Sequence, residues 1–250
     1  MDKLRNDIQD KCFQDILVYI SRTFSLIDFI HEKIVKLKGK LFGEFETEET
    51  LEAFSIKLVC DWEWFIERTI INCLIKDTSS LSTHLNLNLP PTITYDVGFA
   101  ILNGTGYFDI KNTGNLKGLT KKVLTENLNP FVRISKDRCD SIDDFYIIRN
   151  YIAHKSEASK RSYKKLLLDR KHITDFIEPG KYLLRGPEGA RHPFETNFNF
   201  HGCAFWVSAL DIWEFLYPDS HREILDEKGD FNQESMIKLK RMATFRKPSQ

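Results

Sequence analysis

Apolar residues recur at steps of three and four along the first third of the chain, which is the spacing of an amphipathic helix. This pattern predicts a long helix over residues 3–38, ended by Gly39 and Gly43. Its apolar positions are Ile8, Phe13, Ile16, Leu17, Ile20, Phe24, Ile27, Ile30 and Ile34. A second long helix is predicted over about 47–77, where acidic residues follow Thr47 in the first turn.

Glycine and proline residues interrupt the helical pattern after Asp77 and mark an insertion over about residues 78–130. A structureless loop of that length is unusual in a compact domain. We therefore expect the insertion to hold short elements, with a helix over 116–128 and a small β-hairpin around 94–111 as one option. Its lysines make it locally basic, either as a solvated surface or as an RNA contact.

A further helix is predicted over 139–158, starting near Ser141 with Asp143 and Asp144 in its first turn. A basic helix or turn continues from it to about Asp169. This second stretch carries the densest cluster of positive charge in the chain.

A connector over about 172–198 precedes a strongly apolar helix over 199–217. Three histidines around the connector match no metal-binding spacing and are expected at the surface or as helix caps: His172, His192 and His201. The sequence thus predicts a mostly α fold, an antiparallel bundle of four to five main helices with an irregular insertion, for which a partly β structure is one option. The bundle fills residues 1–220, and 221–250 form a C-terminal helix and a basic tail.

Charge, cysteine spacing and the motifs that are missing argue against several classes of protein. Lys and Arg number 36, as do Asp and Glu, so the formal net charge is zero and only a local basic groove is expected. The five cysteines form no CxxC pair, which supports neither a zinc site nor a disulfide framework but fits buried thiols in a reducing cytoplasm. Motifs for phosphate loops, zinc proteases and serine hydrolases are missing. With no signal peptide and no apolar run of membrane-spanning length, we predict a cytoplasmic protein with no membrane partner.

The segment 149–154, RNYIAH, is the strongest candidate for chemistry. Arginine is rarely buried without a partner, and its planar guanidinium suits phosphate oxygens. A histidine changes its charge near neutral pH and so can move a proton. Arg149 and His154 therefore indicate a site that binds an anion and transfers a proton, while the alternative is a buried polar network that ties helices together.

The spacing within this segment constrains the site. Asn150 and His154 are four residues apart and share a helix face, whereas Arg149 lies five residues before His154, well round the helix. Both can meet one phosphate only if the arginine side chain wraps, the helix distorts, or a second subunit completes the site. The basic residues that follow are expected either to contact RNA or to form a solvated face: Lys155, Lys160, Arg161, Lys164 and Lys165.

The RNxxAH form of this segment resembles the R-x4-6-H motif of HEPN domains, which are small all-α domains. The earlier stretch 61–67, DWEWFIE, is similar to the WExF helix of several HEPN ribonuclease branches, and the order of the two segments also fits. The resemblance covers residues 5–218. It implies a HEPN-like bundle, and many members of the family are metal-independent ribonucleases that act as dimers.

The resemblance assigns roles to the candidate residues. RNA carries its own nucleophile, the 2′-hydroxyl, so cleavage needs proton transfer by His154 and phosphate contacts from Arg149, without a metal. Asn150 would orient the histidine or hold the phosphate, and Tyr151 would supply a hydroxyl or stack on a base. Two carboxylates one turn apart, Glu63 and Glu67, either form a solvated acidic edge or orient Arg149 or His154.

The function predicted from sequence is a metal-independent endoribonuclease that leaves 2′,3′-cyclic phosphate and 5′-hydroxyl ends. No cofactor is expected; the expected partners are an RNA substrate, a second copy of the chain and a cognate inhibitor or activator. The family implies a toxin or antiviral effector. One alternative is a non-catalytic HEPN-like scaffold or RNA- or partner-binding subunit, and another is an acceptor for a separate nucleotidyltransferase that modifies Tyr151.

Overall fold

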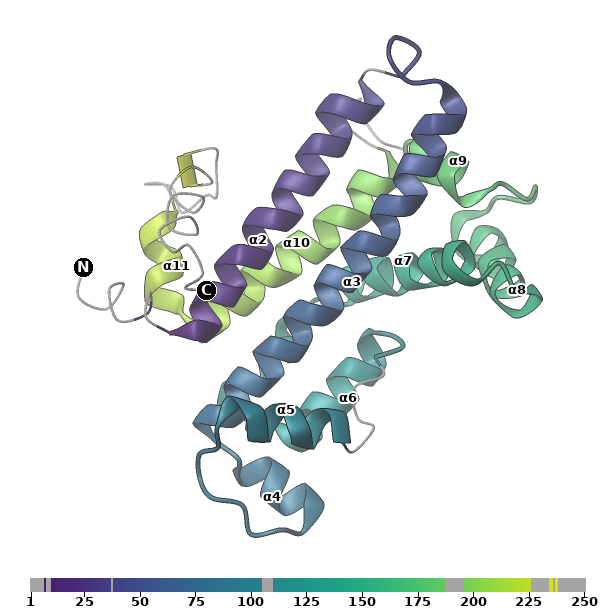
Figure 1. Cartoon of the computed structure of the whole chain (residues 1–250). Helices are drawn as coiled ribbons and strands as arrows, with labels where there is room; N and C mark the ends of the chain where they lie inside the picture. The colour runs from purple at the N-terminus through teal and green to yellow at the C-terminus, as the bar shows by residue number, and fades with distance from the viewer. Residues whose placement is uncertain are drawn as a thin grey trace. The chain divides into compact units, whose positions relative to one another are not determined.

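The computed structural model describes residues 7, 10–36, 38–104, 110–187, 196–225, 234, 235 and 237. Within these residues the chain is mostly helical and holds no strand, so the predicted mostly α class is confirmed. Four helices of this part have 19 residues or more. They are α2 (Lys11–Phe29), α3 (Glu44–Lys76), α7 (Lys136–His154) and α10 (Asn197–Leu216), as Figure 1 shows.

Shorter helical elements connect the long ones. They are the π-helix η1 (Ile30–Val35), α4 (Ser79–Leu85), α5 (Tyr95–Gly104), α6 (Thr113–Val123), the 3-10 helices η2 (Glu126–Leu128) and η3 (Pro130–Arg133), α8 (Glu157–Lys165), the π-helix η4 (Leu166–Arg170), α9 (Pro179–Leu184) and α11 (Pro218–Ile224). The connector predicted over 172–198 therefore holds the short helix α9, while most of the predicted C-terminal tail lies outside the described residues.

The β-hairpin expected around 94–111 is wrong, because residues 95–104 form helix α5. A helix here can lie close to α3, since a Cβ built on Gly98 would already be only 3.2 Å from Ile71. The sequence pattern predicts a break at Gly98, whereas in the fold this glycine permits close packing. Residues 105–109 lie outside the described part.

The start of the motif helix also differs from the prediction. Helix α7 begins at Lys136, five residues before Ser141. An exposed ion pair between Lys136 and Asp140, 2.8 Å between Nζ and Oδ2, occupies its first turn. Asp144 therefore lies in the middle of the helix, where it is buried.

The chain divides into two compact units. Unit 1 comprises the described residues within Met1–Arg22, Glu63–Ser135 and Val207–Gln250, and unit 2 those within Thr23–Trp62 and Lys136–Trp206. Helices α2, α3 and α10 each contribute one segment to each unit. This division does not test the boundary predicted near residue 220.

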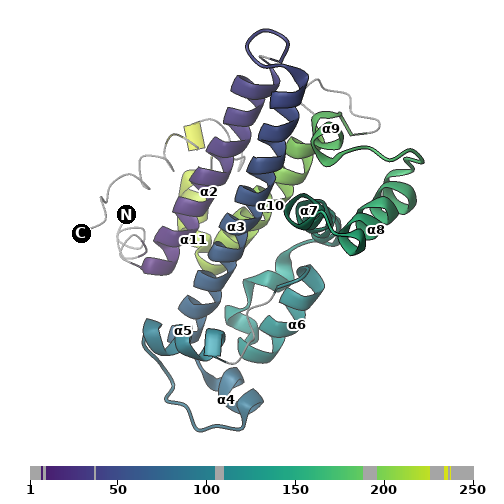
Figure 2. The same cartoon turned by 45° about the vertical axis from the view of Figure 1, so that its right-hand side comes forward.

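In unit 1, α2 and α3 pack antiparallel. The ring of Tyr19 stacks on Phe65 with centroids 4.3 Å apart, and further along, Lys76 Nζ contacts Asp10 Oδ2 at 2.8 Å. The insertion belongs to this unit, with α4, α5 and α6 gathered around the C-terminal end of α3 (Figure 2). The insertion thus forms a small group of helices at the C-terminal end of α3.

In unit 2, an aromatic core joins α3, α7 and α10. Phe205 lies 5.5 Å from both Trp62 and Phe145, and Phe198 lies 6.0 Å from Phe145, in edge-to-face arrangements between ring centroids. Edge-to-face contacts of this kind stabilise a core beyond the burial of apolar area. This core fixes the position of the middle of α7.

The expectation that His201 lies at the surface or caps a helix is wrong. Its side chain is fully buried on α10, and its Nδ1 atom lies 2.8 Å from Ser141 Oγ and 3.0 Å from the Ser141 carbonyl oxygen. Burial, assisted by the positive charge of Lys171, lowers the pKa of His201 to about 3. His172 is exposed as predicted, and His192 lies outside the described residues.

None of the five cysteines forms a disulfide in the described chain: Cys12, Cys73 and Cys139 are buried, whereas Cys60 and Cys203 are exposed. The expectation of buried thiols therefore holds for three of them. In the part of the chain that the structure describes, no helix is both long and apolar enough to cross a bilayer.

Candidate functional site

The end of α7 presents His154 to solvent. His154 is the last residue of the helix and is exposed. Lys155 then adopts a left-handed backbone conformation with φ 47°, and its N–H donates to the Tyr151 carbonyl at 2.9 Å. A non-glycine residue rarely adopts this conformation, which ends the helix sharply. His154 is therefore exposed at the point where the helix ends.

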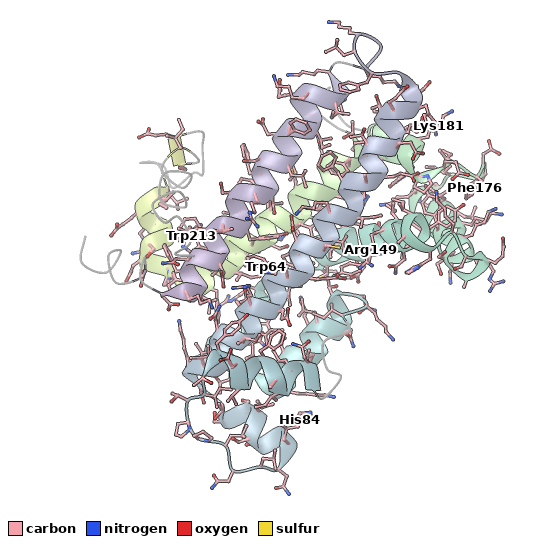
Figure 3. All side chains as sticks on the ribbon, viewed as in Figure 1. Trp64, His84, Arg149, Phe176, Lys181 and Trp213 are labelled. Carbon is pink, nitrogen blue, oxygen red and sulfur yellow. The ribbon has the colours of Figure 1, made fainter. Side chains whose placement is uncertain are left out.

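Arg149 and His154 do not share a face of α7. The helix is regular through both residues, so their side chains leave the axis about 140° apart. The guanidinium carbon of Arg149 lies 5.3 Å from the centroid of the Tyr146 ring, so this side chain runs back along the helix, away from its end. Figure 3 labels Arg149 on α7. Of the three geometries that would unite the pair, neither helix distortion nor wrapping of Arg149 toward His154 is adopted.

Asn150 lies beside His154, about 40° away around the axis and one turn earlier. It is half-buried, as are Ile147 and Asp143 on the same face. The face from Asp143 to His154 is therefore the partly open side of α7. Asn150 therefore shares this face with His154, and its role in orienting the histidine or holding a phosphate stays a prediction.

Tyr151 is buried rather than open to a ligand. Only 5% of it is exposed, and its ring stacks on Tyr163 of α8 with centroids 5.3 Å apart and planes 16° apart. Phe176, which follows η4, packs edge-on against both rings, 6.1 Å from Tyr151 and 6.0 Å from Tyr163. A base has little room to stack on Tyr151, whose ring instead anchors the end of α7 to α8.

A carboxylate that the sequence did not single out, Glu52, also fixes this end. Its Oε2 atom lies 3.4 Å from Lys155 Nζ, and its Oε1 atom accepts a hydrogen bond from the Gly180 N–H at 2.9 Å. Gly180 is needed because a Cβ there would lie 2.7 Å from the backbone oxygen of Glu48. Glu52 thereby links α3, the residue after α7, and α9. Its acidic surroundings in the sequence gave no signal of this role.

The predicted RNA-binding residues extend from the motif along α8. Lys160 and Lys164 place their Nζ atoms 5.4 and 5.5 Å from the centroid of Phe176, while Arg161 and Lys165 are exposed. Ser156 caps α8, its Oγ accepting from the Ser159 N–H at 3.2 Å. Nine Lys and Arg residues stand against four Asp and Glu between residues 155 and 185. The positive charge is therefore local, in a chain with no net charge.

A buried carboxylate ties α7 to η4. Asp144 forms ion pairs with Arg170 and with Lys171, whose Nζ atom lies 2.7 Å from Asp144 Oδ2. Burial raises the pKa of Asp144, and the hydrogen bond from Lys171 opposes that rise. Two of the cations that follow the motif in the sequence are thus paired with a buried carboxylate.

Glu63 and Glu67 belong to unit 1, whereas the motif belongs to unit 2. Both are half-buried, and Glu67 Oε1 accepts a hydrogen bond from Asn103 at 2.9 Å. Their role in orienting Arg149 or His154 stays a prediction.

No group of three or more His, Cys, Asp or Glu side chains suited to a metal occurs among the described residues.

In comparisons with known proteins, no family model, no curated protein and no solved structure matches the chain.

Proposed function

We propose that this protein is a HEPN-like, metal-independent endoribonuclease that acts as a homodimer in the cytoplasm. The observation that carries the proposal is the exposed His154 at the end of α7. It is followed directly by Lys155 and then by the basic residues of α8. An exposed imidazole beside concentrated positive charge suits proton transfer on a polyanion. A toxin or antiviral effector under a cognate regulator is the setting that the resemblance suggests.

His154 transfers the proton in this mechanism. The 2′-hydroxyl of RNA attacks the adjacent phosphorus as its proton passes to a base, and the 5′-oxygen leaves with a proton from an acid. The products are a 2′,3′-cyclic phosphate and a 5′-hydroxyl. A guanidinium such as that of Arg149 stabilises the charge that builds on the phosphate oxygens.

The geometry of α7 favours sites shared between two chains. Within one chain Arg149 and His154 leave the helix about 140° apart, and Arg149 lies on Tyr146. A two-fold dimer can bring the two residues to one phosphate, because Arg149 of one copy can contact the phosphate that lies next to His154 of the other copy.

The first test is cleavage of total cellular RNA in the presence of EDTA. Wild type should leave cyclic-phosphate ends, and His154→Ala should lose about 10²–10⁴-fold in rate, the usual contribution of general acid–base catalysis. The matched control is His84→Ala, which removes an exposed histidine of α4 and should keep full activity. Wild-type rates from His154→Ala would rule the proposal out.

The shared site has its own test in mixed dimers. Arg149→Ala and His154→Ala chains should each be inactive, yet a heterodimer of the two rebuilds one site from Arg149 of one chain and His154 of the other. Activity near half that of wild type is expected. A dead heterodimer with both chains folded would place the two residues in the same site of one chain instead.

A second function is favoured by one observation. Arg149 folds onto Tyr146 within its own helix, as a residue that serves packing would. In that case the protein is a non-catalytic scaffold whose motif builds a dimer interface. Arg149→Ala would then lower the melting temperature or split the dimer on size-exclusion chromatography, and wild type would not cleave RNA.

A further inference from the structure

Phe176 is an aromatic ring that the core leaves partly uncovered. It lies between η4 and α9 and is 37% exposed, whereas its partners Tyr151 and Tyr163 are buried. Both tyrosines contact it edge-to-face, so they hold the ring in place. A held but accessible ring is the feature on which unpaired nucleic-acid bases stack.

Phe176 also lines a hollow of about 630 Å³ within unit 2. The described residues that surround it include His172, Asp175, Phe176, Glu178, Lys181 and Arg185. Figure 3 labels Phe176 and Lys181, which come from the loop after η4 and from α9 respectively. A hollow of this size accepts a ligand of nucleotide dimensions.

The charges around the ring are divided. Lys160 and Lys164 hold positive charge within 5.5 Å of the Phe176 centroid, on the α8 side. The hollow mixes Lys181 and Arg185 with carboxylates, among them Asp175 and Glu178. Carboxylates repel a phosphate but accept hydrogen bonds from the amino and imino groups on a base edge. Phosphates are therefore favoured at α8, and a base is favoured in the hollow.

We propose that Phe176 and this hollow form a subsite for one unstacked nucleobase of single-stranded RNA, with Lys160 and Lys164 holding the adjoining phosphates. The inference rests on the proposed function, since it takes RNA to be the substrate of His154. The Tyr151 ring, 6.1 Å from Phe176, lies one turn before His154 on α7. The bound base thus neighbours the phosphate that is cleaved, and the subsite sets which sequence is cut.

The experiment measures binding apart from cleavage, in the His154→Ala background. Fluorescence polarisation with labelled single-stranded RNA oligonucleotides reports affinity. Phe176→Leu keeps an apolar side chain of similar size and should weaken binding about tenfold, within the usual effect of losing one stacked base, whereas Phe176→Trp should retain it. The control Phe45→Leu, at a residue 69% exposed on α3, should leave affinity unchanged.

Charge is tested by a matched pair of double variants. Lys160→Glu/Lys164→Glu should weaken binding more than Lys121→Glu/Lys122→Glu, which reverses the same charge on two exposed lysines of α6. Equal losses would mean that binding follows overall charge alone and would overturn the subsite. So would equal affinity of Phe176→Leu and wild type in the presence of normal folding.

Two further arms identify the ligand and separate the claims. If free GMP or AMP displaces the labelled RNA as effectively as an unlabelled single-stranded oligonucleotide does, the RNA subsite is overturned in favour of a nucleotide site. Duplex RNA should compete poorly, because its bases are stacked. Cleavage by wild type without any dependence on Phe176 removes the subsite and leaves the nuclease, whereas Phe176-dependent binding without cleavage removes the nuclease and leaves the subsite.

Discussion

Helix α7 carries charged and polar residues both in its middle and at its C-terminal end, and the two regions use them differently. In the middle, Asp144 is buried in ion pairs with Arg170 and Lys171, and Ser141 contacts the buried His201. At the end, His154 is exposed, and Lys155 turns the chain away. The charge of Asp144 in the middle of the helix is thus neutralised by ion pairs within the fold, whereas the imidazole of His154 at its end is exposed.

The comparison predicts which variants lose stability and which lose activity. Changes around the buried middle should lower the free energy of unfolding, and changes at the open end should alter cleavage or binding with little cost to stability. Proteins often show this division, because functional groups are exposed on a rigid support.

The largest effect is expected from acid. Burial lowers the pKa of His201 to about 3 from an ordinary 6.5. Between these two pH values the histidine is protonated in the unfolded chain but stays neutral in the folded chain. The free energy of unfolding should therefore fall by up to about 1.4 kcal/mol per pH unit from pH 6.5 down toward 3. Urea titrations at several pH values measure this slope.

The matched variant for the acid effect is His201→Gln, which should reduce the slope over this window even if it lowers stability at neutral pH. An unchanged slope would mean that other groups cause the acid sensitivity. The exposed His172→Gln is the control and should keep the wild-type slope.

The next effect concerns Asp144→Ala. Removing the carboxylate leaves Arg170 and Lys171 without their shared partner, and breaking buried pairs in this way costs about 3–5 kcal/mol. The partial exposure of the two cations should place the loss near the lower figure, about 3 kcal/mol. Thermal or urea unfolding measures it, and Asp169→Ala, at an exposed residue of η4, should change stability by less than about 0.5 kcal/mol.

How far the sequence predicts this molecule follows the same division. Helical periodicity located α3 and α10 to within a few residues, because their apolar faces fill a core. It placed the start of α7 five residues late and left His201 at the surface, since burial of a polar residue depends on partners distant in the chain, such as Ser141. The exposed His154 was predictable as a candidate because its motif is local.

Glu52 and Phe176 were not predictable as parts of the site. Glu52 acts through Gly180, which lies far along the chain, and Phe176 gains meaning only when Tyr151 and Tyr163 support it. A single sequence carries no signal for such contacts. The division of Glu63 and the motif between the two units was likewise invisible in their order along the chain.

A smaller effect is expected where α9 packs against α3, at the glycine whose N–H donates to Glu52. Gly180→Ala would bring a Cβ within 2.7 Å of the Glu48 backbone, so α9 must shift and the hydrogen bond from Gly180 to Glu52 weakens. Overpacking of this kind costs about 1–3 kcal/mol, measurable by thermal unfolding. Gly118→Ala, where a Cβ meets nothing within 4 Å on α6, should instead be neutral or stabilising; a loss there equal to that of Gly180→Ala would contradict the steric explanation.

The smallest change in stability is expected at Lys155. Its left-handed conformation, φ 47°, is one that glycine adopts without strain, so Lys155→Gly relieves the backbone while it removes the contacts with Glu52 and the Tyr151 ring. The two effects oppose each other, and the free energy of unfolding should move by less than about 0.5 kcal/mol. RNA affinity should nevertheless fall and its salt dependence weaken, because one cation next to His154 is lost. Lys155→Ala separates the causes, since it loses the same charge and keeps the strain; it should match Lys155→Gly in RNA affinity and be the less stable of the two. If the two variants instead differ in affinity, the backbone turn and not the charge presents His154 to the substrate.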